Sequence, residues 1–108
     1  GPEIEEAYVL LHADHKIYKV MLDDIQYIEG LKEYVSYFTK EKRIIVLQSL
    51  KSIEESLPSD KFIRVHRSYI VPIHKIKTLD GNQVQIGDKL IPIGRSYKED
   101  VLKRVFNE

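Results

Sequence analysis

Short runs of β-branched and aromatic residues recur along this chain and are separated by turn signals. Asp80-Gly81-Asn82 and Gly87-Asp88 are typical hairpin turns, because glycine accepts a positive φ at little cost. Runs of this kind at a spacing of ~8–12 residues indicate a layered all-β domain. We expect strands over residues 8–12, 17–20, 25–28, 34–38, 44–47, 62–65, 69–71, 76–79, 84–86 and 89–91.

Two segments depart from the strand pattern. Apolar residues at helical spacing follow Ser49, and Pro58 ends the pattern, which predicts a short internal helix. Near the end, Ser96 and Glu99 have the spacing of a capping box, and a short C-terminal helix should follow to about Phe106. The fold class is therefore mostly β, with one short internal helix and a short C-terminal helix.

The length of 108 residues suits a single domain. Gly1-Pro2 resembles the remnant of a protease cleavage, so we expect residues 1–6 to be that remnant plus a flexible linker, and residues 7–108 to be the domain. The longest apolar run has five residues, which excludes a membrane span of the helical kind. No secretion signal is visible, and the expected location is the cytoplasm.

Charge is balanced over the whole chain and uneven along it. Seventeen basic residues match seventeen acidic ones, but residues 1–30 have a net charge of −5 and residues 61–79 a net charge of +5. A basic segment on one face can attract phosphate locally even when the total charge is zero. The alternative interpretation of this basic segment is a solvated strand face whose charge is balanced by acidic residues elsewhere in the chain.

Residues for catalysis or metal binding are scarce. The chain has no cysteine, no glycine-rich phosphate loop and no nucleophile elbow. His12 and His15 lie in a segment that reads as strand, turn and strand, where a pair of surface histidines is expected rather than a metal site. We therefore expect no enzymatic activity, no metal and no cofactor.

The segment at residues 62–71 (Phe-Ile-Arg-Val-His-Arg-Ser-Tyr-Ile-Val) carries the most information. Its alternation places Arg64 and His66 on one face and breaks at Arg67-Ser68. A guanidinium fork at such a break can bind phosphate or a guanine edge. The alternative is a structural arginine whose stem covers apolar surface.

This segment strongly resembles the central signature of the LytTR DNA-binding domain, the output domain of LytR/AlgR-type bacterial response regulators. Four other segments match the family in the same order and extend the resemblance to nearly the whole chain. They are residues 24–30 before the first DNA-contacting loop, 31–35 in that loop, 50–57 in a short helix, and 91–97 in the closing motif.

The resemblance implies an elongated fold of small antiparallel sheets that binds double-stranded DNA through loops. Two loops would enter successive major grooves, and a third segment would contact the minor groove between them. The implied DNA contacts of the first loop are Lys32 and Tyr34, and that of the last loop is Arg95. The implied contacts of the middle segment are His66, Arg67 and Ser68. Tyr34 could instead pack in the core, and Lys32 could simply be solvated.

The resemblance also implies partners. An upstream receiver domain, phosphorylated by a sensor histidine kinase, would promote homodimerisation on paired similar half-sites of a promoter, with no membrane involved. Many relatives have asparagine after the signature where this chain has Pro72, which removes an amide and a side-chain hydrogen bonder. The alternative function is a β-rich protein-interaction module without affinity for DNA.

Overall fold

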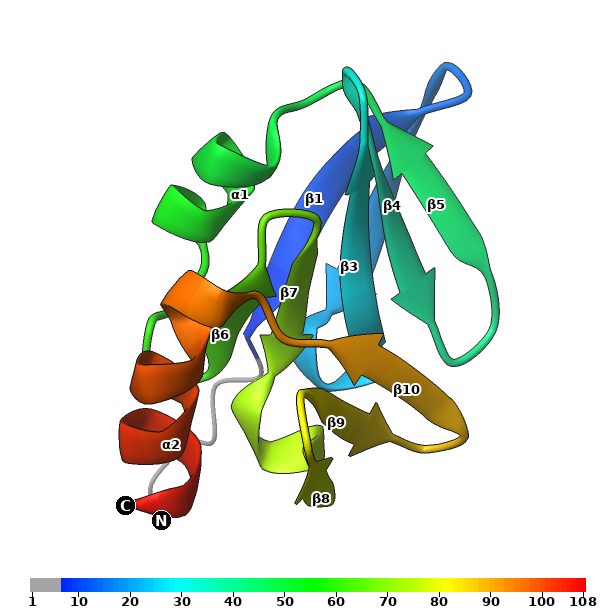
Figure 1. Cartoon of the computed structure of the whole chain (residues 1–108). Helices are drawn as coiled ribbons and strands as arrows, with labels where there is room; N and C mark the ends of the chain where they lie inside the picture. Colours follow the sequence, from blue (N-terminus) through cyan, green and yellow to red (C-terminus); the bar gives the residue numbers. More distant parts are fainter. Residues whose placement is uncertain (1–6) are drawn as a thin grey trace, which may run out of the picture.

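The computed structural model describes residues 7–108, so the linker expected over residues 1–6 lies outside the described residues. Residues 7–108 form ten strands with short helical segments between them (Figure 1). The strands are β1 (Tyr8–Ala13), β2 (Lys16–Met21), β3 (Ile25–Leu31), β4 (Tyr34–Thr39), β5 (Arg43–Val46), β6 (Phe62–His66), β7 (Tyr69–Pro72), β8 (Thr78–Asp80), β9 (Gln83–Ile86) and β10 (Lys89–Pro92). The helices are α1 (Leu50–Ser56) and α2 (Lys98–Phe106), with 3₁₀ turns η1 (Leu22–Asp24), η2 (Ile73–Lys75) and η3 (Arg95–Tyr97).

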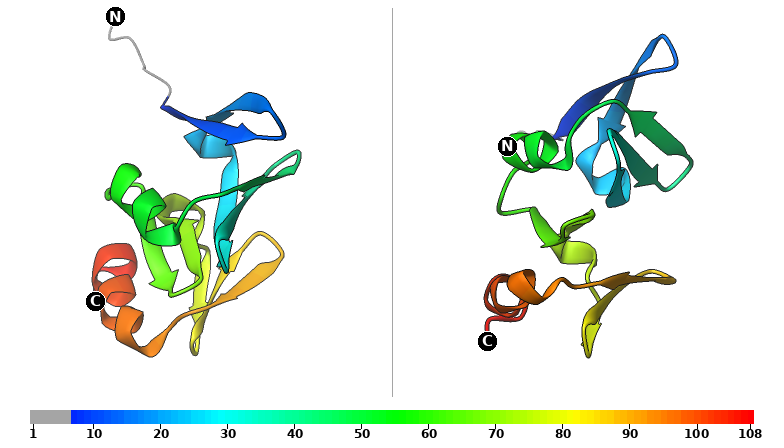
Figure 2. Two further views of the ribbon diagram at one scale, coloured as in Figure 1. Left: turned by 90° about the horizontal axis from the view of Figure 1, so that it is seen from above. Right: turned by 45° about the horizontal axis from the view of Figure 1, so that its top comes forward.

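The strands form three antiparallel sheets, which confirms the mostly β fold class. The central sheet has the order β5-β4-β3-β7-β6, and the smaller sheets are β1-β2 and β10-β9-β8. Both helices lie on the same side of the molecule in every view (Figure 2). Each neighbouring pair in the central sheet except β3-β7 is joined by a short connection, and the β3-β7 pair brings distant parts of the sequence together.

The tight turns follow from residues that accept a positive φ. Asp14 and His15 have φ of 54° and 60°, which is the type I′ pattern that joins twisted strands. The strand expected over residues 76–79 was wrong at its start. Ile76 is the C-cap of η2, and its amide donates to the carbonyl of Ile73 at 3.2 Å, so β8 begins only at Thr78.

Two hydrophobic cores lie on opposite faces of the central sheet. The first is covered by β1, β2 and α1, and includes Ile28, Tyr37 and Ile53. The second is covered by β9, β10 and α2, and includes Val65 and Val101. The strands near β6 are therefore covered on both faces, which holds this end of the sheet firmly between the two layers.

One helix start was predicted correctly and the other was wrong. The Ser49 hydroxyl accepts a hydrogen bond from the amide of Ser52 at 3.1 Å, as expected of an N-cap. Ser96 does not cap α2, because it lies inside η3, which runs directly into the helix. The N-cap of α2 is Tyr97, which makes no side-chain capping bond.

Candidate nucleic-acid interface

Three turns that are distant in sequence are connected through their backbones. The amide of Gly30, at the end of β3, donates to the carbonyl of Ser68 in the β6–β7 turn at 2.8 Å. The amide of Gly94, before η3, donates to the carbonyl of Val65 at 2.8 Å. The β6–β7 turn is therefore tied to the β3–β4 turn on one side and to the residues before α2 on the other.

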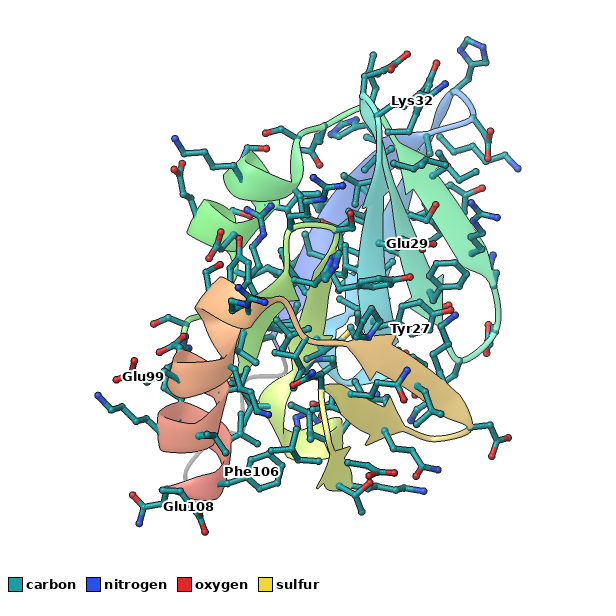
Figure 3. All side chains as sticks on the ribbon, in the orientation of Figure 1. Tyr27, Glu29, Lys32, Glu99, Phe106 and Glu108 are labelled. Carbon is teal, nitrogen blue, oxygen red and sulfur yellow. The ribbon has the colours of Figure 1, made fainter. Side chains whose placement is uncertain are left out.

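The first turn is shorter than the loop expected over residues 31–35. β3 continues to Leu31 and β4 begins at Tyr34, so only Lys32 and Glu33 form the turn. Lys32 has a φ of 58° and is exposed at the tip of this hairpin (Figure 3). Tyr34 does not pack in the core, because 49% of its surface is exposed.

The middle turn consists of Arg67 and Ser68. The amide of Ser68 donates to Nδ1 of His66 at 3.0 Å. The His66 side chain therefore helps to hold the backbone of the turn, in addition to lying next to Arg67 and Ser68. His66 and Ser68 are partly buried, whereas Arg67 is exposed. The backbone of this turn is held by hydrogen bonds, so the Arg67 side chain projects from a fixed base.

A β-bulge in β6 corrects the expectation that Arg64 and His66 share a face. Arg64 is paired with Ile70, but the register then shifts and His66 is paired with Tyr69. Because Ile70 and Tyr69 are adjacent on β7, their side chains point to opposite faces of the sheet. Strand alternation in the sequence gives no sign of the extra residue.

Arg64 is a structural residue that the sequence did not reveal. Its guanidinium donates from Nε to the carbonyl of His66 at 3.3 Å and from Nη2 to the carbonyl of Arg67 at 2.6 Å. Its Nη1 forms an ion pair of 3.1 Å with Oε1 of Glu54 on α1. The resemblance of the surrounding segment to a family signature was the available signal, but it did not indicate this role.

The third turn depends on a close approach at Gly94. A Cβ atom there would lie 2.9 Å from Cδ2 of Tyr97 and 3.7 Å from the Cα of His66. Arg95 follows directly, is exposed, and opens η3. This close packing fixes the position of the Arg95 backbone, and so the starting point of its side chain, relative to the Arg67-Ser68 turn.

The unpaired arginines are found at these turns. The chain has five arginines, and the side chains of Arg43, Arg64 and Arg104 all donate hydrogen bonds to protein atoms. Within residues 7–108, the guanidinium groups of Arg67 and Arg95 form no ion pair. Two planar donor groups therefore remain available to an external phosphate or base.

The rest of the basic segment is divided between different parts of the molecule. Lys75 donates from Nζ to the carbonyls of Asp23 and Ile25, the second at 3.1 Å. Burial, followed by repulsion from Lys40, lowers the pKa of Lys75. It lies in η2, at the opposite end of β7 from Arg67. The segment with net charge +5 does not form a single basic face.

A pocket elsewhere contains both signs of charge. It has a volume of about 200 Å³ and opens between β2 and the β4–β5 turn, lined in part by Tyr18, Lys19, Asp24, Lys40 and Lys42. Among the described residues, no three histidine, aspartate or glutamate side chains converge as metal ligands. No helix in residues 7–108 is long and apolar enough to cross a membrane.

Comparison with known proteins identifies the fold and the family. Residues 15–105 match the family model described as the LytTr DNA-binding domain. The chain belongs to the LytTR family. Its three connected turns are thus part of a DNA-binding domain of the kind found in response regulators, and this family is defined by DNA binding rather than by catalysis.

Solved and curated relatives agree with this assignment. The LytTr DNA-binding domain of a putative methyl-accepting/DNA response regulator from Bacillus cereus is similar, with a TM-score of 0.77 and 25% identity over 92% of this chain and 96% of that one. Sensory transduction protein LytT of Enterococcus faecalis is 29% identical over 97% of this chain, and that of Bacillus subtilis 31% over 74%. The regions matched by this chain make up 45% and 36% of these two relatives, less than half of each.

Proposed function

We propose that this LytTR domain binds double-stranded DNA in a sequence-specific manner through its three connected turns. The β3–β4 turn, with Lys32 and Tyr34, and the turn at Arg95 would enter successive major grooves. The Arg67 turn, with His66 and Ser68 beside it, would contact the minor groove between them. Guanidinium groups suit both tasks, because they bind base edges in the major groove and are attracted to the negative potential of a narrow minor groove.

The observation that carries this proposal is the pair of hydrogen bonds from Gly30 to Ser68 and from Gly94 to Val65. They fix the order of the three turns, with the Arg67 turn in the centre. Side chains that read DNA need a rigid base, because small displacements weaken directional hydrogen bonds. The two unpaired arginines then lie on adjacent turns of one connected unit.

Selection from a random duplex library tests the proposal directly. The selected duplex and a scrambled duplex of the same composition are compared by titration at several salt concentrations. We expect tighter binding to the selected duplex and a linear fall of log affinity with log salt. Equal affinity for both duplexes would remove sequence specificity, and an affinity that salt does not change would remove DNA binding.

The same proposal includes further domains in the parent protein. An upstream receiver domain, phosphorylated by a sensor histidine kinase, would bring two copies together on paired half-sites of a promoter. The short coverage of the LytT relatives supports this arrangement, since more than half of each lies outside the matched region. A gel-shift titration with one and with two half-sites would show whether two copies bind cooperatively.

A second function has a specific observation in its favour. Tyr8, Leu10 and Ile17 on the β1–β2 hairpin each expose more than half of their surface. Exposed apolar side chains on one hairpin suit a protein-interaction module of the β-rich kind. Such a module requires no affinity for duplex DNA, so the salt titration above distinguishes it from the first function.

A further inference from the structure

Beside the bulge in β6, three carbonyl groups near the Arg67 turn accept hydrogen bonds from donors outside the β6–β7 pairing. The register shift between Arg64 and His66 interrupts the pairing of β6 with β7. The carbonyl of Val65 accepts from the amide of Gly94, and the carbonyls of His66 and Arg67 accept from the Arg64 side chain. The Arg64 side chain therefore supplies two hydrogen-bond donors at the base of the turn.

The orientation of Arg64 is set from outside the sheet. Its side chain is only 18% exposed, and the third arm of its guanidinium is bound by Glu54 of α1 at 3.1 Å. The guanidinium is planar, so fixing one arm fixes the directions of the other two. The helix before the turn thus determines how the carbonyls of His66 and Arg67 are held.

We propose that Glu54 and Arg64 form a brace that positions the β6–β7 turn, and that Glu54 thereby contributes to DNA sequence discrimination through Arg64. Both are positioning residues, and the inference rests on the proposed DNA-binding function of the turn. Without the carboxylate, Arg64 can rotate between partners and the turn samples more conformations. Arg67 then meets the minor groove from a less defined position. This weakens binding to the selected DNA sequence more than binding to other sequences.

Glu55 provides a matched control. It is the next residue of α1, is exposed, and forms no ion pair within the part of the chain that the structure describes. Glu54→Gln and Glu55→Gln each remove one negative charge from the same helix. Both variants should therefore gain similar general attraction for phosphate, and only the first loses the brace.

The DNA experiment compares the ratio of affinities for the selected and the scrambled duplex. We expect Glu54→Gln to lower this ratio at least threefold and Glu55→Gln to leave it at the parent value. Arg64→Lys keeps the positive charge but lacks the forked guanidinium group, so it should lower the affinity ratio at least as far as Glu54→Gln does. The double variant Arg64→Lys/Glu54→Gln should have a ratio only slightly lower than that of Arg64→Lys alone. Equal ratios for the two glutamine variants would overturn the proposal.

A second readout does not depend on DNA. Amide hydrogen exchange in the free domain should be at least threefold faster at Ser68 and Gly30 in Glu54→Gln than in Glu55→Gln, while amides of β9 exchange at parental rates. Both experiments are run where thermal melting shows each variant to be folded. If the parent does not distinguish the duplexes, the proposed function fails and exchange alone decides the brace. Unchanged exchange at Ser68 and Gly30 would refute it.

Discussion

The hydroxyl of Tyr69 donates a hydrogen bond of 2.6 Å to Oε2 of Glu29 across the β3–β7 pair. Tyr69 follows the Arg67-Ser68 turn, and its ring also packs edge-on against His66 with centroids 5.7 Å apart. Glu29 directly precedes Gly30, whose amide binds the carbonyl of Ser68. A side-chain bond therefore reinforces the backbone bond that joins the first and middle turns.

This bond predicts a loss of stability at alkaline pH. The hydrogen bond to Glu29, followed by burial, raises the pKa of Tyr69 to about 12 from its ordinary value of 10.0. The stabilisation of the folded state that accompanies the raised pKa of Tyr69 is complete below pH 10 and disappears as pH rises to about 12. The reason is that the unfolded chain loses the phenolic proton at a lower pH than the folded chain does. At pH 8, Tyr69→Phe should lower the free energy of unfolding by ~1 kcal/mol.

Thermal melting of the parent and Tyr69→Phe between pH 8 and 12 measures this effect. The difference in melting temperature should shrink above pH 10, since only the parent has the bond to lose. Tyr8→Phe, at an exposed site, supplies the baseline for general alkaline effects. A difference that stays constant across this range would contradict the assignment of the raised pKa to the bond with Glu29.

Gly94→Ala should disturb the third turn. The new Cβ would lie 2.9 Å from Cδ2 of Tyr97, closer than a carbon–carbon contact permits, and the ring packs against the second core. Overpacking of this kind costs ~1–3 kcal/mol of stability. Denaturant unfolding should show that loss, whereas Gly30→Ala has a Cβ at an ordinary 3.5 Å from Leu50 and should cost less. Equal stability of Gly94→Ala and the parent would contradict the close approach.

Much of the fold could be predicted because its signals are local. Hairpin turns such as Asp14-His15, and the N-cap at Ser49, depend on residues adjacent in sequence, and the structure has them where the sequence indicated. The capping box at Ser96 was equally local and was wrong. A 3₁₀ turn, stabilised by the bond from the amide of Tyr97 to the carbonyl of Gly94 at 2.9 Å, takes Ser96 into the helical region.

The arrangement of the interface could not be predicted from local patterns. The bulge after Arg64 adds one residue to a strand without changing its apolar pattern, so alternation placed His66 on the wrong face. The partner of Arg64 is ten residues away on a helix, and Glu54 has no sequence feature that separates it from Glu55. Whether the six candidate contacts touch DNA stays a prediction.

Arg67→Ala and Arg95→Ala should each weaken binding to the selected duplex by ~1–3 kcal/mol. Both side chains are exposed and unpaired within residues 7–108, so the melting temperature should stay near that of the parent. Isothermal titration with the selected and scrambled duplexes measures the effect. A large fall in melting temperature in either variant would show that the loss is structural and not due to a missing contact.

The two candidate contacts of the first hairpin, Lys32 in the turn and Tyr34 at the start of β4, should behave differently. Tyr34→Ala is expected to reduce the difference in affinity between the selected and scrambled duplexes, because an exposed ring at the turn can reach base edges. Lys32→Asn removes the ammonium group and suits the φ of 58° at this position, so it should lower both affinities together. Equal effects on both duplexes by both variants would exclude this turn from base readout.

Salt dependence separates the lysines that face DNA from those that support the fold. Each phosphate neutralised contributes about −0.9 to the slope of log affinity against log salt. Lys75 belongs to the segment of residues 61–79 that has a net charge of +5, and a basic segment of this kind would be expected to contribute to the slope. The structure changes that expectation for Lys75, which donates to the carbonyls of Asp23 and Ile25 at the opposite end of β7 from the Arg67 turn.

Lys75→Gln should therefore leave the slope at the parental value and lower the free energy of unfolding by ~1 kcal/mol, since it breaks hydrogen bonds from a charged donor that is partly exposed. Lys32→Asn should show the reverse, with a slope about one unit flatter and little change in stability. Fluorescence anisotropy at four or more salt concentrations gives the slopes, and urea denaturation gives the stabilities. A flatter slope for Lys75→Gln would mean that η2 lies against phosphate, and the DNA would then have to contact a face of the domain away from the three connected turns.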